Sequence, residues 1–214
     1  MISMPRFLRL ILASALLIAS GAVVAQADDA DKLTATEVVE GLHAELLQSM
    51  KNAKELGYAG RFQQLKPVIE RSFAIPMLAK STVRGYWDKF TPTQQEQFIA
   101  NFRHLTIDTY AQLFDGFDGE SFEILEEKEI ARGNRQVNAQ LVKADGEKIS
   151  LVYVLTPDAN SWQVVNVVAQ GVSDLALKRS QYVGVLKKQG VDAFLTRFND
   201  QIEALPDPTF KGSE

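Results

Sequence analysis

The sequence lacks cysteine altogether and contains only two histidines among its 214 residues. Without thiols the chain cannot form disulfides, iron–sulfur clusters, cysteine-ligated zinc sites or a thiol nucleophile. An excess of charge of one sign is also missing, because the formal net charge is only −4. This slight acidity argues against nucleic acid as a partner, since phosphates attract basic surfaces. The 46% of hydrophobic residues is enough for a globular core.

Motifs of common catalytic sites are missing as well. The sequence contains no G-x-S-x-G, H-E-x-x-H, P-loop or G-x-G-x-x-G pattern. His104 and Asp108 are four residues apart, but a metal or a catalytic base needs further partners, so we interpret them as a solvated helix face. His43, beside Leu42 and Leu46, is interpreted as lying at the boundary of the core. We therefore predict no catalytic residue, no metal site and no cofactor.

Residues 1–27 have the composition of a signal peptide. Arg6 and Arg9 precede an apolar run over 10–24, and Ala25-Gln26-Ala27 has the small residues that a signal peptidase recognises. A membrane anchor is the alternative, but this run of 15 residues is shorter than the ~20 that span a bilayer. We predict cleavage after Ala27 and export of the remaining chain.

The first predicted helix has a clear beginning and end. Thr34 and Glu37 form a capping-box pattern, in which each side chain satisfies a backbone N–H of the other residue. Apolar residues at helical spacing follow, so the pattern predicts an amphipathic helix over roughly 35–54. We expect Gly57 and Gly60 to separate it from the next helix.

Three further helices are predicted before the sheet. Apolar residues over 62–73 indicate a short helix, and Pro76 suits the first turn of another that ends near Gly85. Thr91-Pro92-Thr93-Gln94 then combines a capping threonine with proline at the first helical position. The helix that it begins should run to about Phe114.

Alternating side chains predict four antiparallel strands joined by short loops. The first strand contains Phe122 and Ile124, and the second contains Val137, Ala139 and Leu141. An Asp-Gly pair typical of hairpin turns precedes the third strand, over 148–155, and the fourth covers 162–169. Helices return from Ser173, with Gly190 as a break, and residues 206–214 are expected to be a flexible tail. The chain is thus predicted to be α+β, with a single domain over 28–205.

Both faces of the third and fourth strands carry apolar residues at their centres. Strict alternation places Leu151, Tyr153 and Leu155 on one face of the sheet and Val152 and Val154 on the other face. The same rule places Val164 and Val168 on one face and Val165 and Val167 on the other face. A sheet covered on one side alone should alternate apolar and polar residues. Two explanations remain open, a sheet sandwiched by helices and a sheet with one face lining an apolar cavity.

Several stretches resemble the MlaC, or toluene-tolerance, family of periplasmic phospholipid-shuttle proteins. The matching residues span nearly the whole exported chain and are Phe73–Ala79, Val83–Trp87, Thr91-Pro92 with Gln95, Phe98, Phe102, Leu105 and Tyr110, and Trp162–Ser173. Two other stretches, over 114–122 and 171–180, are more similar to the hopanoid-associated, HpnM-like subgroup.

The resemblance implies both a fold and a function. It implies a four-stranded twisted antiparallel sheet wrapped by several helices, with a phospholipid or a hopanoid-type lipid bound in an apolar cavity. The protein would carry this lipid, without catalysis, through the periplasm. Its partners would be an inner-membrane ABC transporter with an MCE-domain subunit and an outer-membrane lipoprotein complex.

Apolar residues of the aromatic-rich helices and of the strands are the candidates for lining such a cavity. Trp87 and Trp162 are interpreted as packing residues instead. The predicted lipid-binding residues are Met77, Val83, Tyr86, Phe98, Phe102, Leu105, Tyr110, Leu141, Leu151, Tyr153, Val165 and Val167.

Two other functions remain as alternatives. Helices on a curved antiparallel sheet also describe cone-shaped isomerases and dehydratases, which need an ionisable pair inside the cavity, such as a buried His104 and Asp108. A docking adaptor of an ABC transport complex would instead use a charged surface and have no cavity. The acid-rich segment over 115–129 is the candidate for a basic partner of such an adaptor. Separately, the basic residues over 173–198 are candidates for contact with a phosphate headgroup or an anionic membrane surface.

Overall fold

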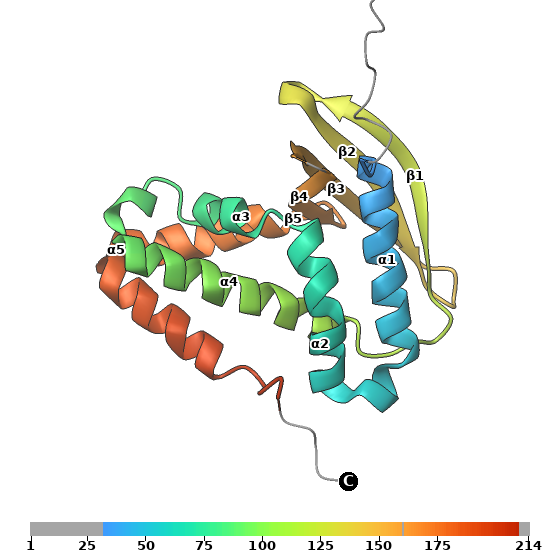
Figure 1. Cartoon of the computed structure of the whole chain (residues 1–214), viewed down its shortest axis with the longest axis horizontal. Helices are drawn as coiled ribbons and strands as arrows, with labels where there is room; N and C mark the ends of the chain where they lie inside the picture. The colour runs from blue at the N-terminus through green and yellow to red at the C-terminus, as the bar shows by residue number, and fades with distance from the viewer. Residues whose placement is uncertain (1–31, 160, 210–214) are drawn as a thin grey trace, which may run out of the picture. The chain divides into compact units, whose positions relative to one another are not determined.

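The computed structural model describes residues 32–159 and 161–209 (Figure 1). The predicted signal peptide and its cleavage site after Ala27 lie outside the described residues. Among the described helices, none is both long and apolar enough to cross a membrane. Helices and an antiparallel meander occupy separate stretches of the chain, which confirms the α+β class.

The helices of the described residues begin where the capping patterns predict. Thr34 N–H donates to the Glu37 carboxylate at 2.7 Å, and Glu37 N–H donates to the Thr34 hydroxyl at 3.1 Å. Thr91 and Gln94 form the same reciprocal pair, with bonds of 2.9 and 3.2 Å. The elements are α1 (Ala35–Lys51), α2 (Ala53–Ser72), α3 (Ile75–Thr82), the short 3₁₀ turn η1 (Trp87–Lys89), α4 (Pro92–Leu113) and α5 (Asp174–Glu203).

Two of these helices are interrupted by glycines with positive φ. Gly57 has a φ of 58° and bends α2 near its start, whereas Gly60, also predicted as a breaker, stays helical. Gly190 has a φ of 84° and a ψ of −179°, a conformation that only glycine adopts readily. It divides α5 into two legs, over 174–189 and 191–203, which double back on each other (Figure 1).

The sheet is a meander in the order β1-β2-β3-β4-β5. Its strands are β1 (Ser121–Ile130), β2 (Asn134–Val142), β3 (Lys148–Asp158), β4 (Ser161–Ala169) and β5 (Val172–Ser173). The prediction of four strands is wrong by one, because residues 172–173 pair back onto the end of β4. The turn between them is Gln170-Gly171, with φ values of 50° and 80°, and positive φ at both positions is what a tight hairpin turn requires.

A bulge in β4 changes which of its residues share a face. Tyr153 pairs with Val167 and Leu155 pairs with Val164, so Val164 and Val167 lie on the same face of the sheet. Strict alternation had placed these two valines on opposite faces, which is wrong. One additional residue, Val165, is inserted at the register shift, and a bulge of this kind reverses the alternation beyond it.

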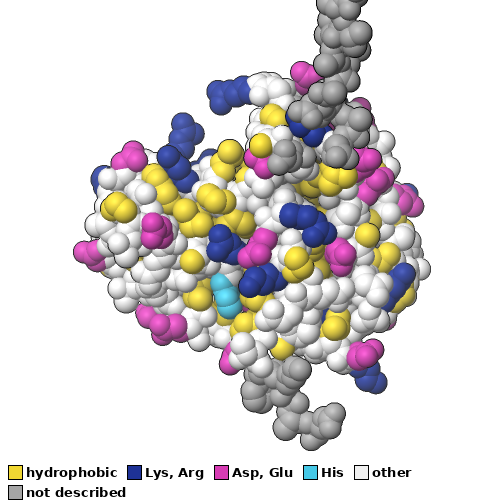
Figure 2. All heavy atoms as spheres, in the orientation of Figure 1, with side chains coloured by type: hydrophobic (Ala, Val, Ile, Leu, Met, Phe, Trp, Pro, Cys, Tyr) yellow, Lys and Arg dark blue, Asp and Glu magenta, His cyan; other side chains and the backbone are white. Residues whose placement is uncertain are grey.

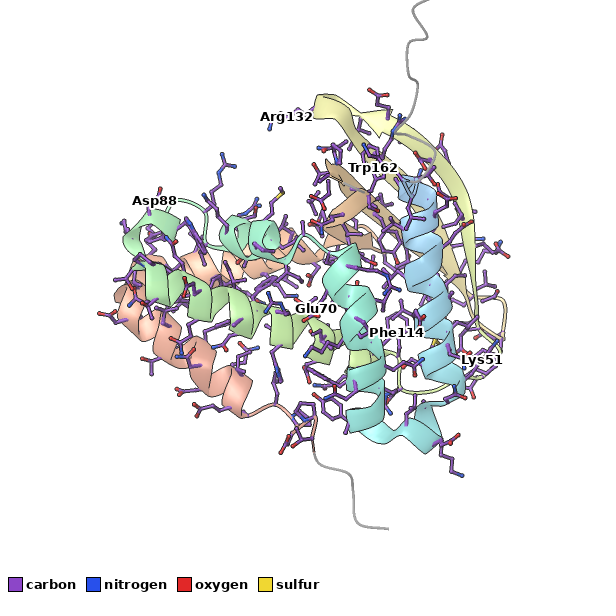
Figure 3. The ribbon with its side chains drawn as sticks, viewed as in Figure 1. Lys51, Glu70, Asp88, Phe114, Arg132 and Trp162 are labelled. Atoms are coloured by element: carbon purple, nitrogen blue, oxygen red, sulfur yellow. The ribbon has the colours of Figure 1, made fainter. Side chains whose placement is uncertain are left out.

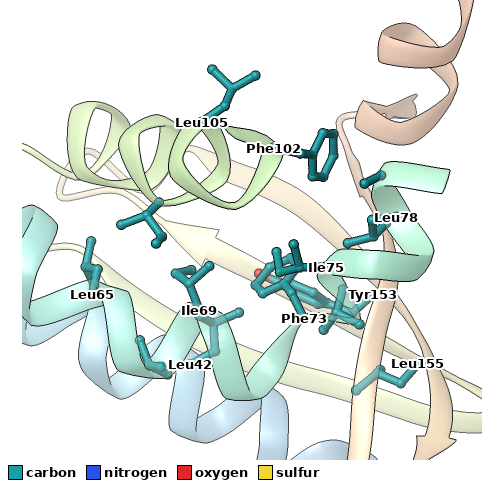
Figure 4. Packing of buried hydrophobic residues seen from close by; sticks show 14 of the residues in the cluster. Leu42, Leu65, Ile69, Phe73, Ile75, Leu78, Phe102, Leu105, Tyr153 and Leu155 are labelled. Carbon is teal, nitrogen blue, oxygen red and sulfur yellow. The ribbon is translucent and has the colours of Figure 1, made fainter. Parts of the chain in front are cut away.

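The helices pack on the face that carries Val137, Tyr153, Leu155 and Val164, all of which are buried. Figure 4 shows Leu42 of α1 and Ile69 of α2 among the side chains packed at this face. Val152, Val154 and Val168 of the opposite face are half-buried, and the described helices lie on the other side of the sheet in Figure 1. Within the described residues the sheet is therefore not sandwiched by helices. The face in Figure 2 shows basic and acidic side chains interspersed with hydrophobic ones.

A second part of the core is an aromatic cluster between α4 and the two legs of α5. Phe98 is at its centre, and its ring centroid lies 4.9 Å from that of Phe198. Phe90, Tyr182 and Phe194 surround this pair. The cluster holds the second leg of α5 against α4.

Candidate functional site

A pocket of about 310 Å³ lies between the inner face of the sheet, α4 and the first leg of α5. The junction between α2 and α3 contributes one wall, because Ala74 N–H donates to the Val164 carbonyl at 3.1 Å and holds Phe73 against β4. In Figure 4, Phe102 projects from α4 towards Leu78, with Phe73 and Tyr153 below them. The lining residues are Phe73, Leu78, Phe102, Thr106, Thr109, Tyr110, Leu113, Phe114, Leu151, Tyr153, Val164, Asn166, Val167, Ala169, Val172, Asp174, Leu175, Leu177 and Lys178.

The wall formed by α4 presents little unsatisfied polarity. The hydroxyl groups of Thr106 and Thr109 donate to carbonyls of the preceding helical turn, at 2.8 and 2.7 Å. The Tyr110 ring stacks on Phe114, with ring centroids 5.8 Å apart. Burial raises the pKa of Tyr110, so its hydroxyl is neutral at physiological pH. A ligand in contact with this wall would meet mostly hydrocarbon, because the two threonine hydroxyls are already bonded within the helix.

The hydroxyl of Tyr153 is bound by His43 of α1, so the protein itself satisfies it. The distance between Tyr153 Oη and His43 Nε2 is 3.0 Å, and the His43 ring stacks on Phe122 with centroids 4.2 Å apart. Burial lowers the pKa of His43 to about 4 and raises the pKa of Tyr153, so both groups are neutral at pH 7. His43 is buried, so its interpretation as a boundary residue is wrong. Its neighbours Phe122 and Tyr153 are distant in sequence, and only tertiary contacts bring them around it.

Charged and exposed apolar residues meet at the mouth of the pocket. Lys178 and Asp174 are the charged residues of the lining, and they form an ion pair across one turn of α5. Leu113, Val172 and Leu177 also line the pocket, yet these three side chains are 70%, 59% and 50% exposed. An opening bordered by exposed hydrocarbon is typical of a site that receives an apolar ligand.

Five of the predicted lipid-binding residues line this pocket, namely Phe102, Tyr110, Leu151, Tyr153 and Val167. Four others lie on helices or just after one, but elsewhere: Met77 is exposed on α3, Val83 just after α3 and Phe98 are buried, and Leu105 is buried and points away from the sheet in Figure 4. The remaining three are Tyr86, which is partly buried below Lys89, Leu141 of β2, and Val165 at the bulge. Their contact with lipid stays a prediction.

The sequence did not predict most of the residues at the mouth of the pocket. Leu113 lies on the same helical face as Phe102 and Tyr110 but was not among the predicted lipid-binding residues, and nothing local distinguishes Leu177 from an incidental exposed leucine. Val172 belongs to β5, the strand that was not predicted. Phe114, at the end of α4 in Figure 3, was recognised only as the end of a helix.

The two tryptophans contribute to packing, as interpreted. Trp87 stacks on Phe90 with ring centroids 6.0 Å apart. Trp162 packs partly buried against the core, with the guanidinium carbon of Arg135 5.9 Å from its ring centroid. Figure 3 places Trp162 towards the end of the sheet near the hairpin that carries Arg132. Neither tryptophan lines the pocket.

Asp108 is buried rather than solvated, which corrects the interpretation of its helix face. Asp108 is 2% exposed, and its carboxylate accepts a 2.8 Å hydrogen bond from the Tyr58 hydroxyl. Gln112 Nε2 donates to both carboxylate oxygens at 2.7 and 2.8 Å. His104 instead packs its ring against Phe62, with centroids 5.0 Å apart. These contacts join α2 to α4 outside the pocket, and they give Asp108 a structural role.

The part of the chain that the structure describes contains no candidate metal site. Among the described residues, no three histidine, aspartate or glutamate side chains are placed to hold one metal ion. The pocket itself contains a single carboxylate, that of Asp174, and this carboxylate is already paired with Lys178.

Comparison with known proteins supports a family assignment. The sequence model of the family described as "MlaC protein" matches residues 40–200. The intermembrane phospholipid transport system binding protein MlaC of Haemophilus influenzae is 32% identical over 124 residues, which cover 56% of this chain and 58% of that protein. The toluene tolerance protein ttg2D of Pseudomonas putida is 26% identical over 168 residues, covering 74% of this chain and 76% of the relative. The match thus spans less than two thirds of the Haemophilus protein.

A solved structure has the same fold. The phospholipid-binding protein of Ralstonia solanacearum, determined in complex with a phospholipid, superposes with a TM-score of 0.69. The superposition covers 79% of this chain and 99% of that one, at 21% sequence identity. Because the family model extends over most of the helices and the whole sheet, the chain belongs to the MlaC protein family.

Proposed function

We propose that this chain is a periplasmic lipid-binding shuttle that carries a phospholipid, or a hopanoid-type lipid, between the inner and outer membranes. The observation that carries the proposal is the apolar pocket between the sheet, α4 and α5, with exposed leucines at its mouth. Relatives named for intermembrane phospholipid transport and a structure that contains a phospholipid support it.

The physical requirement of such a shuttle is an apolar enclosure. Two acyl chains with roughly 30 methylenes cost on the order of 25 kcal/mol to expose to water, at about 0.8 kcal/mol each. No catalytic group removes that cost, because it arises from hydration and not from a chemical barrier. A wall of aromatic and aliphatic side chains with satisfied hydroxyls is therefore the feature that the function needs.

The pocket is smaller than two acyl chains require. An engineered apolar cavity of about 150 Å³ accommodates benzene. By that measure a pocket of about 310 Å³ has room for about a dozen carbon atoms, fewer than two acyl chains contain. Large empty apolar cavities are unfavourable, so we expect the helices to close on the sheet without lipid and to separate on loading.

The proposed shuttle is not an enzyme. The ionisable residues of the pocket are two tyrosines, which burial keeps neutral, and the Lys178–Asp174 pair at the mouth. Acid–base catalysis needs an ionisable pair facing the cavity interior. The contacts of Asp108 with Tyr58 and Gln112, rather than with His104, also argue against the isomerase or dehydratase alternative.

The proposal includes the organisation of the chain and its partners. Residues 1–27 would be removed after Ala27, and residues 28–205 would form a single lipid-binding domain. Of the predicted tail over 206–214, residues 210–214 lie outside the described residues. The partners would be an inner-membrane ABC transporter with an MCE-domain subunit and an outer-membrane lipoprotein complex. No catalytic cofactor is expected, because the bound lipid is the ligand.

Lipid extraction tests the function directly. The exported protein is purified without detergent, extracted with organic solvent and analysed by mass spectrometry, and we expect a lipid in near-stoichiometric amount. Phe102→Asp and Leu151→Glu should abolish it, because a charge in the pocket would be desolvated by an acyl chain. Leu125→Glu, at an exposed leucine of β1 outside the pocket, is the matched control. A lipid-free wild type that also takes up no lipid from vesicles would refute the shuttle.

A further inference from the structure

Lys178 is the one cation among the residues that line the described pocket. Its side chain is 17% exposed, whereas that of its partner Asp174 is 58% exposed. A lysine in this setting lies with its methylenes along apolar surface and its ammonium at the water boundary. Leu175 and Leu177, which precede it in the sequence, also line the pocket.

The other basic residues of this helix are engaged elsewhere or lie outside the pocket. Arg179 Nε donates to the Ser81 carbonyl at 2.9 Å and ties α5 to α3. Lys187 and Lys188 are exposed and do not line the pocket. A negatively charged group of a ligand seated at the mouth would therefore meet Lys178.

Asp174 already occupies the position of such a negative group. It is the first residue of α5, where Ser173 caps the helix by accepting a 3.1 Å bond from Ala176 N–H. The helix dipole favours an anion at this end, and Lys178 one turn later supplies a full positive charge. The carboxylate of Asp174 is mostly exposed, so it can rotate into water and leave this place to another anion.

We propose that Lys178 binds the headgroup phosphate of a phospholipid at the pocket mouth, in exchange for the carboxylate of Asp174. The inference rests on the proposed function and specifies its substrate class. Acyl chains enter the apolar interior beside Phe102 and Leu151, while the phosphodiester stays at the rim bordered by Leu113, Val172 and Leu177. A lipid without phosphate, such as a neutral hopanoid, gains nothing from Lys178, so the site discriminates in favour of phospholipids.

The test compares two lipids that differ only in the phosphate headgroup. Lipid-free exported protein is incubated with radiolabelled phosphatidylglycerol or radiolabelled diacylglycerol with the same acyl chains, each dispersed in a phosphate-free neutral detergent, and the label bound to protein is measured. Lys178→Met should lower phosphatidylglycerol binding about tenfold, because a charge-assisted contact is lost, and leave diacylglycerol binding unchanged. Asp174→Asn should raise phosphatidylglycerol binding, because the competing anion is removed. Lys188→Met, on the same leg of α5, is the matched control and should change neither.

Each other outcome has a defined meaning. If the wild type binds both lipids but Lys178→Met changes neither, or lowers both equally, the headgroup site is refuted while the shuttle stands. If the wild type binds neither lipid, the shuttle is refuted and the headgroup site with it. Excess inorganic phosphate should not displace phosphatidylglycerol, and displacement that depends on Lys178 would show a site for free phosphate instead. Retained diacylglycerol binding shows that each variant is folded.

Discussion

The imidazole Nε2 of His43 lies 3.0 Å from the hydroxyl oxygen of Tyr153, joining α1 to the pocket wall across 110 positions of sequence. His43 is also stacked on Phe122 of β1, so one side chain connects the first helix to two strands. Protonation of His43 would place a positive charge among buried side chains, which is unfavourable. The contact therefore makes the wall of the pocket sensitive to acid.

The stability of the protein should fall between pH 6.5 and pH 4 because of His43. Its pKa is about 4 in the folded protein and about 6.5 in an unfolded chain, so within this window the unfolded state binds more protons. Above pH 6.5 His43 contributes no pH dependence, and below pH 4 the loss reaches its limit of about 3 kcal/mol. Urea unfolding at a series of pH values measures this slope. His43→Phe should remove that part of the slope, whereas His104→Phe should retain it.

Replacing Asp108 should weaken the protein without affecting the pocket. Asp108→Ala leaves the Tyr58 hydroxyl and the Gln112 amide without their acceptor, and we expect a loss of about 2–4 kcal/mol in the free energy of unfolding. Tyr58→Phe alone should cost less, and the double variant should cost less than the sum because the two residues share one bond. Lipid content should stay at the wild-type level. Loss of lipid from a folded Asp108→Ala protein would contradict the assignment of a structural role.

Two glycines of α5 provide a matched pair for backbone strain. A Cβ at either Gly184 or Gly190 would meet no atom within 4 Å, so space does not distinguish them. Gly184→Ala should stabilise the protein by about 0.5–1 kcal/mol, because alanine favours a helix over glycine. Gly190→Ala should destabilise it by about 1–3 kcal/mol, because φ is 84° there. Thermal unfolding compares the two, and equal effects would contradict the interpretation of Gly190 as the required bend.

Removal of lipid should lower the melting temperature. A ligand present at a hundred times its Kd adds about 2.7 kcal/mol to stability, which for a chain of this size is about 5–10 °C. Protein freed of lipid by organic washing and refolding should melt lower, and phospholipid vesicles should restore the original value. Leu151→Glu, with a charge in the pocket wall, should show no difference between the two preparations. An identical melting temperature for lipid-loaded and lipid-free wild type would indicate that the lipid is not bound within the fold.

Local chemistry explains the elements that the sequence predicts well. The Thr34 and Thr91 capping boxes depend on residues three positions apart, so their pattern is readable without a fold. The break at Gly190 and the Asp145-Gly146 turn are equally local, since each depends on the conformation that one glycine allows. These signals account for the order of helices and strands and for the α+β class.

Contacts between distant segments explain where the prediction is wrong. The bulge at Val165 and the pairing of β5 depend on the register of neighbouring strands, and together they change which residues face the pocket. The burial of His43 and Asp108 depends on Tyr153 and Tyr58, which lie 110 and 50 positions away.

By itself, the sequence determined the elements, their order and the apolar character that a lipid site would need. Only the tertiary structure decided which apolar residues form the pocket and which fill the core. Phe98 and Phe102 illustrate the difference, because both lie on α4 and both are buried, but only Phe102 lines the pocket. Helical periodicity predicts that such residues face the interior. The packing of α5 and the sheet then determines whether a side chain contacts a neighbour or lines the pocket.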